Sequence, residues 1–169
     1  GKAEGISGET LAEKYLVKAG ACHRCPIACG RVIKVGEKVV GGPEYEPLWA
    51  YGANMDNNDL ASINEANMWC NEYGLDAISV PCTIAAAMEL YQRGAIKEED
   101  CAGAPLEWGN VASLIEWTKR MGDPKTELDW LMSSGSARLC EHYGMPEVSM
   151  SVKKQEMPAY DARGVQGTG

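Results

Sequence analysis

The sequence lacks the features that would assign it to a membrane or to a nucleic acid. No apolar run approaches the roughly 20 residues that a helix needs to cross a bilayer. No charged segment followed by an apolar leader opens the chain. Positive charge is in deficit, because 16 Lys and Arg residues stand against 24 Asp and Glu residues, which gives a net charge of −8. Since nucleic acids and anionic lipids require a positive patch, we expect neither a nucleic acid nor a membrane as a partner.

The sequence also lacks the even cysteine count of a disulfide framework. It has 7 cysteines, and three of them lie close together in residues 22–29. Secreted scaffolds normally pair an even set. Free thiols or metal thiolates in a reducing compartment fit better, so we expect a cytoplasmic protein. The 169 residues, of which 45% are hydrophobic and 24% charged, suit a globular chain with one core and exclude a disordered one.

The two ends of the sequence predict a piece of a larger protein. The chain begins at Gly1 and stops in the turn-rich residues 167–169 without a closing element. After Val148 the helical pattern gives way to alternating and then turn-rich residues, which indicates a domain boundary. We therefore expect a helical domain over residues 1–150, and we expect residues 151–169 to begin the following domain and to be poorly ordered.

Hydrophobic periodicity predicts a mainly α fold, a multi-helical domain with a small β-hairpin. The expected helices cover residues 7–18, 59–73, 81–93, a segment after Asn110, and 126–143. Asp59 can cap the start of the second helix and Gly74 can end it in a left-handed conformation. Gly135 weakens the middle of the last helix. Residues 31–40 alternate weakly around a Gly-Glu pair, which indicates the hairpin.

The cysteine cluster has the spacing of a metal-binding loop. Residues 22–29 read Cys-His-Arg-Cys-Pro-Ile-Ala-Cys, a C-x2-C-x3-C pattern. Soft thiolates at Cys22, Cys25 and Cys29 would select zinc, copper(I) or an iron–sulfur cluster. Three thiolates leave one corner of a cubane cluster to a ligand from elsewhere. Pro26 removes one backbone donor and stiffens the loop.

The spacing alone leaves two other interpretations open. Zinc sites usually show two pairs of ligands, whereas this loop has one C-x2-C pair with His23 inside it. The three cysteines could also be free structural thiols. Cys70 and Cys140 fall on apolar helical faces, so we predict that they are buried packing residues.

The residues around these cysteines resemble the aldehyde ferredoxin oxidoreductase family, whose members carry tungsten, or sometimes molybdenum, on two pterin cofactors. The matching segments follow one another along the chain, at residues 21–31, 42–50, 52–54, 65–67, 74–79, 88–91, 152–154 and 158–164. Because they extend over nearly the whole sequence, the resemblance is far more specific than the cysteine motif alone.

The resemblance implies a reaction and its cofactors. The parent enzyme would oxidise an aldehyde to a carboxylic acid at a tungsten or molybdenum bis-pterin, which is bound mostly by parts outside this chain. Electrons would pass through a [4Fe-4S] cluster held by Cys22, Cys25 and Cys29 to ferredoxin. In the family, the fourth cluster cysteine and a histidine near the metal lie beyond Gly169. We therefore expect the chain alone to be inactive and to hold a cluster weakly or not at all.

A rival hypothesis is an electron-transfer or interaction subunit that kept the fold and lost its own catalysis. Retention of Glu46 and Asp76 argues against it. The family also includes members that act on sugar phosphates and on aromatic acyl thioesters. The match around Glu46 favours a general aldehyde enzyme among these.

Four residues take functional roles from the resemblance. Glu46 matches the glutamate that approaches the tungsten, where a carboxylate can deprotonate a water or a hydrated aldehyde. Asn71, Leu75 and Asp76 fall on the pterin-binding motif D-x-x-G-L-D/C. Asn71 replaces the first Asp of this motif, which removes a charge and adds an amide donor. Without the family, Glu46 is a solvated loop acid, and Asp76 caps the turn after Gly74.

Glu65 matches a glutamate through which some family dimers share an iron ion between subunits. The histidines that complete such a site correspond to Met68 and to a position at or near Ile115. We therefore expect a homodimer, where one forms, to lack the bridging iron. Tyr160, Asp161 and Arg163 match the start of the next domain; Arg163 would contact a phosphate or pair with Asp161.

Overall fold

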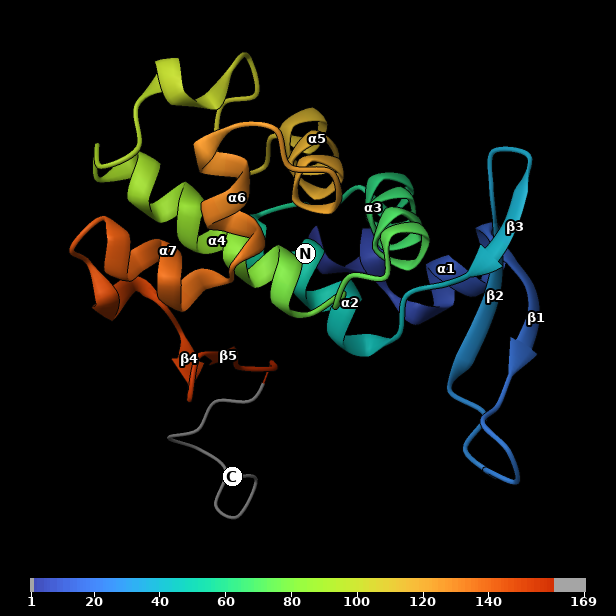
Figure 1. Ribbon diagram of the computed structural model, residues 1–169. Coiled ribbons are helices and arrows are strands. Elements are labelled where there is room, and N and C mark those ends of the chain that lie inside the picture. Colours follow the sequence, from blue (N-terminus) through green and yellow to red (C-terminus); the bar gives the residue numbers. More distant parts are fainter. Residues whose placement is uncertain (1, 160–169) are drawn as a thin grey trace.

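The computed structural model describes residues 2–159 and consists of a helical body beside a small sheet (Figure 1). The helices are α1 (Gly8–Lys14), α2 (Tyr45–Tyr51), α3 (Leu60–Tyr73), α4 (Ser79–Gln92), α5 (Val111–Gly122), α6 (Glu127–Ser133) and α7 (Ser136–His142). The strands are β1 (Leu16–Gly20), β2 (Gly30–Val35), β3 (Lys38–Gly41), β4 (Ser151–Val152) and β5 (Gln155–Glu156). Short 3-10 turns are η1 (Lys2–Ile6), η2 (Ala53–Met55), η3 (Glu98–Cys101) and η4 (Pro146–Val148). The mainly α fold with a small hairpin is confirmed.

Local signals explain where the longer helices begin and end. The Asp59 carboxylate accepts the Ser62 N–H at 3.1 Å at the start of α3. Gly74 ends this helix with φ +67, a left-handed conformation that costs glycine little. The Asn110 side chain accepts the Ser113 N–H at 3.2 Å and starts α5. These capping residues are the ones that the sequence predicts.

Helix α4 is the centre of the helical body and contacts α2, α5, α6 and α7 (Figure 1). Ile84 and Leu90 on this helix are fully buried. Trp117 on α5 is fully buried as well, and its indole N–H donates to the Ala104 carbonyl at 2.8 Å. An apolar helix buried on most sides was expected over residues 81–93, and the structure confirms it. None of the helices in residues 2–159 has the length and apolar character that a membrane span requires.

Two predicted helices are shorter than the sequence suggests. The helix expected over residues 7–18 ends at Lys14, because Leu16 begins β1 and pairs with Ile33 of β2. The helix expected over residues 126–143 is divided into α6 and α7 at Gly135, which has φ +92. Only glycine adopts this conformation readily, so Gly135 breaks the helix instead of merely weakening it.

The sheet is antiparallel, with the strand order β1-β2-β3. The middle of α1 and the start of α3 pack against it through a small core of Leu11, Ile33 and Leu60. The side-chain amides of Asn67 and Asn71 on α3 both donate to the Gly41 carbonyl, at 3.1 and 3.2 Å. These bonds fix the end of β3 against the helical body.

Strands β4 and β5 form a two-stranded hairpin that contacts α4 and α7. Glu156 on β5 is buried there with 7% exposure. The start of the region assigned to the following domain therefore packs on the helices. Residues 160–169, with Tyr160, Asp161 and Arg163, lie outside the described part, and the division near residue 150 stays a prediction.

Candidate functional site

The three clustered cysteines lie in the loop that connects β1 to β2 (residues 21–29, here the cysteine loop). Gly20 and Gly30 pair across its base. A side chain at Gly30 would place its Cβ 3.1 Å from the Gly20 carbonyl oxygen, so the two strands approach more closely than larger residues allow. The loop projects from the end of the sheet, away from the helical body (Figure 1).

The cysteine loop carries three free thiols, which are soft donors for a metal. All three thiols are free; Cys22 and Cys29 are exposed and Cys25 is half-buried. The Cys25 N–H donates to the Cys22 carbonyl at 3.0 Å and forms a tight turn. The Arg31 guanidinium donates to the Cys29 carbonyl. Within residues 2–159, no three His, Cys, Asp or Glu side chains are grouped as metal ligands, so the donor types fit a cluster while their convergence stays a prediction.

Glu46 lies in the first turn of α2, at the edge of a pocket. Its Oε2 accepts the backbone N–H of Ala159 at 2.8 Å, and Ala159 lines that pocket. Glu44, two residues earlier, is exposed at the start of the helix and makes no capping bond. The structure therefore distinguishes the two neighbouring acids, because only Glu46 is held by a distant segment.

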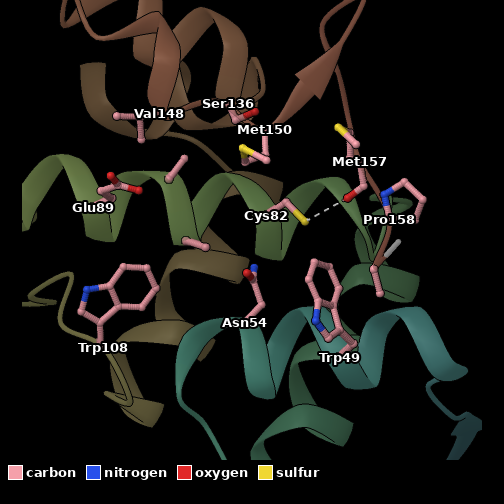
Figure 2. Close-up of a pocket in the computed structure, with 13 residues that line it drawn as sticks. Trp49, Asn54, Cys82, Glu89, Trp108, Ser136, Val148, Met150, Met157 and Pro158 are labelled. Atoms are coloured by element: carbon pink, nitrogen blue, oxygen red, sulfur yellow. Dashed lines mark hydrogen bonds between the residues drawn. The ribbon is translucent and has the colours of Figure 1, made fainter. Parts of the chain in front are cut away.

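The pocket has a volume of about 550 Å³ and runs along α4. Figure 2 shows Cys82 and Glu89 on α4, with Trp49, Asn54 and Trp108 on one side and Ser136, Val148 and Met150 on the other. Most of the lining is apolar, and Met157, Pro158 and Ala159 close one end of it. A mostly apolar pocket with a few polar groups is the usual form of a small-molecule site.

Cys82 is a pocket residue that the sequence did not reveal. Its thiol points to the Met157 carbonyl at 3.9 Å (Figure 2). Burial, followed by the charges of Glu156, Glu46 and Asp76, raises the pKa of Cys82 to about 12. Burial therefore favours the neutral thiol over the thiolate. The sequence carries no signal for it, since Cys82 stands alone in an apolar helix.

The residues of the predicted pterin motif meet at the turn between α3 and α4. The Leu75 N–H donates to the Cys70 carbonyl at 2.8 Å and closes the end of α3. One carboxylate oxygen of Asp76 accepts the N–H groups of Ile78 and Ser79, both at 2.8 Å. Asp76 therefore caps α4, as its local sequence suggests. The Asn71 amide is used for the bond to Gly41, which an aspartate could not make.

Glu65 already has partners within its own chain. Its Oε1 accepts the indole N–H of Trp69 at 3.2 Å and lies 3.7 Å from the Lys119 ammonium. The Lys119 charge also sits over the Trp69 ring, 4.8 Å from its centre. Met68, which stands where the family's histidine is expected, is buried.

Cys70 and Cys140 are fully buried, as predicted. The Tyr51 hydroxyl lies 3.0 Å from the Cys70 sulfur and 3.0 Å from the Thr118 hydroxyl. Burial raises the pKa of each of these two cysteines to about 11. Both are neutral packing residues.

Comparison with known proteins identifies the class to which this helical fold and cysteine loop belong. The sequence model described as "Aldehyde ferredoxin oxidoreductase, domains 2 & 3" matches residues 1–169. The chain belongs to the aldehyde ferredoxin oxidoreductase family.

Its similarity to particular family members is high but covers only part of them. The chain is 52% identical over 167 residues to the tungsten-containing aldehyde ferredoxin oxidoreductase of Pyrococcus furiosus. The matched region covers 96% of this chain and 27% of that protein. The corresponding enzyme of Thermococcus kodakarensis is 50% identical over 165 residues, with the same coverage. The chain thus spans about a quarter of the length of the curated relatives that it matches.

A solved structure shares the fold. It is described as "Active site complex BamBC of Benzoyl Coenzyme A reductase in complex with 1,5 Dienoyl-CoA". The TM-score is 0.75 at 23% identity, over 88% of this chain and 22% of that one. At this identity the likeness shows the fold alone.

Proposed function

We propose that this chain is the helical part of an enzyme that oxidises aldehydes to carboxylic acids, with water as the oxygen source and ferredoxin as the electron acceptor. The observation that carries the proposal is identity of about half over 96% of the chain to two enzymes named tungsten-containing aldehyde ferredoxin oxidoreductase. Free thiols throughout the chain agree with a reducing, cytoplasmic location.

Glu46 is the proposed proton acceptor for the aldehyde reaction. The Ala159 N–H holds its Oε2, which leaves Oε1 to receive a proton from a water or a hydrated aldehyde. The apolar side chains of Trp49, Met157 and Pro158 line the neighbouring pocket and favour an organic substrate there. The chain's own contribution is therefore to bind and orient the substrate and to take up a proton.

The metallopterin, a tungsten or molybdenum bis-pterin, would supply the oxidation chemistry at the aldehyde carbon when bound. Asn71, Leu75 and Asp76 are the residues of this chain proposed to contact it. Support comes from Asp76, which uses one oxygen to cap α4 and keeps the other for the N–H donors of a pterin edge. The remaining contacts would come from the rest of the parent protein.

Cys22, Cys25 and Cys29 are proposed to hold three corners of a [4Fe-4S] cluster, which would supply single-electron transfer to ferredoxin. Their position at the exposed end of the sheet suits contact with a protein partner (Figure 1). The alternative, a subunit that transfers electrons or binds a partner without its own catalysis, predicts that the full-length protein contains neither tungsten, molybdenum nor pterin.

A homodimer would assemble without a bridging iron at Glu65. Lys119 neutralises this carboxylate, and a metal ion would have to displace the ammonium group. Iron or zinc bound to Glu65 at a two-fold interface would contradict this proposal.

The test of the proposed function is Glu46→Gln in the full-length protein. The amide keeps the shape of the side chain and loses the proton acceptor, so kcat should fall by about 10²–10⁴-fold, the range of a positioned acid–base group. Tungsten, pterin and iron contents should stay as in the wild type. Glu44→Gln is the matched control. It removes the same charge two residues before Glu46, and the Glu44 side chain makes no capping bond. Equal turnover of Glu46→Gln and the wild type would remove Glu46 from the mechanism.

A further inference from the structure

A second carboxylate, Glu156, is buried near the pocket without a role in the reaction described above. It lies on β5 with 7% exposure. Its Oε1 accepts the N–H and the hydroxyl of Ser136, both at 2.7 Å, and the Thr83 hydroxyl at 3.4 Å. Within residues 2–159, no Lys, Arg or His forms an ion pair with it. Because burial of an unpaired carboxylate is costly, its retention needs a reason.

A row of serine hydroxyls connects this carboxylate to the surface. The Ser136 Oγ lies 2.9 Å from the Ser149 Oγ, which lies 2.8 Å from the Ser151 Oγ. Ser149 and Ser151 are half-exposed. All of these distances are those of ordinary O–H···O hydrogen bonds, so a proton can pass from each oxygen to the next.

The row meets the pocket at Ser136, and Glu46 is bonded to Ala159 of the same pocket. Ser136 lines the pocket and stands across from Trp49 in Figure 2. Cys82 lies in the same wall, and the charges of both Glu156 and Glu46 act on its thiol. Each carboxylate is therefore one hydrogen bond away from a lining residue of this pocket, Glu46 through Ala159 and Glu156 through Ser136.

The proposed reaction has to release protons from this apolar cavity. One aldehyde and one water give the carboxylic acid, two electrons and two protons; ferredoxin takes the electrons. We propose that Glu156, Ser136, Ser149 and Ser151 form a path that carries protons from the pocket to the solvent at β4. The proposal rests on the proposed function.

Each proton transfer along this path breaks one O–H bond and forms another. A proton from the pocket enters at the Ser136 oxygen, which gives its own proton to Glu156. Glu156 then returns this proton to the Ser136 oxygen, while Ser136 passes its own proton to Ser149. Ser149 does the same to Ser151, and Ser151 gives a proton to bulk water. Glu156 returns to the carboxylate.

The other titratable groups that face Glu156 do not compete for this proton. They are Cys82 on α4 and Cys140 on α7, and the Glu156 charge acts on both. Burial is the main cause that raises their pKa values, to about 12 and about 11. Both thiols thus stay protonated in the range in which an enzyme works.

The test uses the full-length enzyme with Ser149→Ala, which removes the middle of the path. We expect kcat to fall by about tenfold, with a larger solvent deuterium isotope effect, because the proton step becomes limiting. Ser149→Thr should restore both values, and added imidazole should raise the rate of Ser149→Ala by acting as a mobile proton carrier. Ser134→Ala is the matched control; its hydroxyl donates to the Trp130 carbonyl on the surface, and both values should stay unchanged.

Glu156→Gln in the same protein should lower kcat further, by about 10²-fold, because the amide accepts the Ser136 bonds and cannot carry the proton. Should this variant fail to fold, the Ser149 variants carry the test alone. Wild-type kcat and isotope effect in Ser149→Ala would overturn the path. So would a loss that neither threonine nor imidazole restores, since that is the result of a structural role. In either case the proposed function survives if the wild type oxidises aldehydes and Glu46→Gln does not; absence of aldehyde oxidation in the wild type overturns both.

Discussion

The helical body and the cysteine loop are stabilised by different means. In the body, α3 and α5 are capped by Asp59 and Asn110, and Trp117 is enclosed by apolar side chains. In the loop, one backbone hydrogen bond joins Cys25 to Cys22, and the Ile27 side chain is 77% exposed. The body therefore has its own hydrophobic core, whereas none of the three clustered cysteines of the loop belongs to it.

This difference also separates two kinds of chemistry. The residues proposed to act on the substrate, Glu46 and the Glu156 path, are fixed by contacts between distant segments of the body. The residues proposed for electron transfer are held by the strands that flank the loop and by local bonds, from the Cys25 N–H to the Cys22 carbonyl and from Arg31 to the Cys29 carbonyl. A rigid pocket suits the positioning of a substrate, and an exposed loop suits a metal cluster that a protein partner must approach.

Thiol labelling should give the largest difference between the two regions. In metal-free full-length protein at pH 8, iodoacetamide should modify Cys22 and Cys29 and leave Cys70 and Cys140 unmodified. The two buried cysteines have pKa values of about 11, so only about one in a thousand is ionised at pH 8, and labelling should speed up as the pH rises toward 11. Mass spectrometry of the digested protein measures this. Equal labelling in denaturant is the control, and equal labelling of native protein would contradict the contrast.

Truncation of one apolar side chain in each region should affect stability very differently. Trp117→Ala should lower the free energy of unfolding by about 3–5 kcal/mol, because it opens a cavity and leaves the Ala104 carbonyl unpaired. Ile27→Ala in the loop should change it by less than about 0.5 kcal/mol, since that side chain is exposed. Urea denaturation followed by circular dichroism measures both. A loss of several kcal/mol from Ile27→Ala would mean that the loop contributes to the core.

The smallest expected effect concerns the contact between the helical body and the sheet that carries the cysteine loop. Asn71→Asp restores the acid of the family motif and removes the amide that holds the Gly41 carbonyl. Because Asn67 still donates to that carbonyl, the free energy of unfolding should fall by only about 1 kcal/mol. Asn71→Ala separates the lost hydrogen bond from the added charge. An Asn71→Asp protein as stable as the wild type would show that this bond does not hold the sheet.

Local sequence predicted the helices and missed what depends on distant pairing. Asp59 and Gly74 mark the ends of α3 because caps act within one turn. The prediction was wrong for two helices. The helix expected over residues 126–143 breaks at Gly135, which has a positive φ. The helix expected over residues 7–18 ends early because Leu16 pairs with Ile33 of β2 and begins β1. Such a partner, several residues beyond the loop, cannot be recognised from helical periodicity.

The candidate site shows the same limit. Spacing alone singled out the cysteine loop, because its three thiols are close in sequence. Glu46 could be selected only through the family resemblance, as its partner Ala159 lies at the other end of the chain. Cys82 and Glu156 were missed, since nothing near either residue in the sequence indicates that Cys82 lines a pocket or that Glu156 is buried beside it.

The central claim is that the cysteine loop holds an iron–sulfur cluster for a metallopterin enzyme. Low-temperature electron paramagnetic resonance of the full-length protein, recorded together with its iron, sulfide and tungsten contents, tests it most directly. The account predicts the signal and the iron-to-sulfide ratio of a reduced [4Fe-4S] cluster, both lost in Cys25→Ala while tungsten or molybdenum stays bound. Zinc in place of iron, or full iron content in Cys25→Ala, would contradict it.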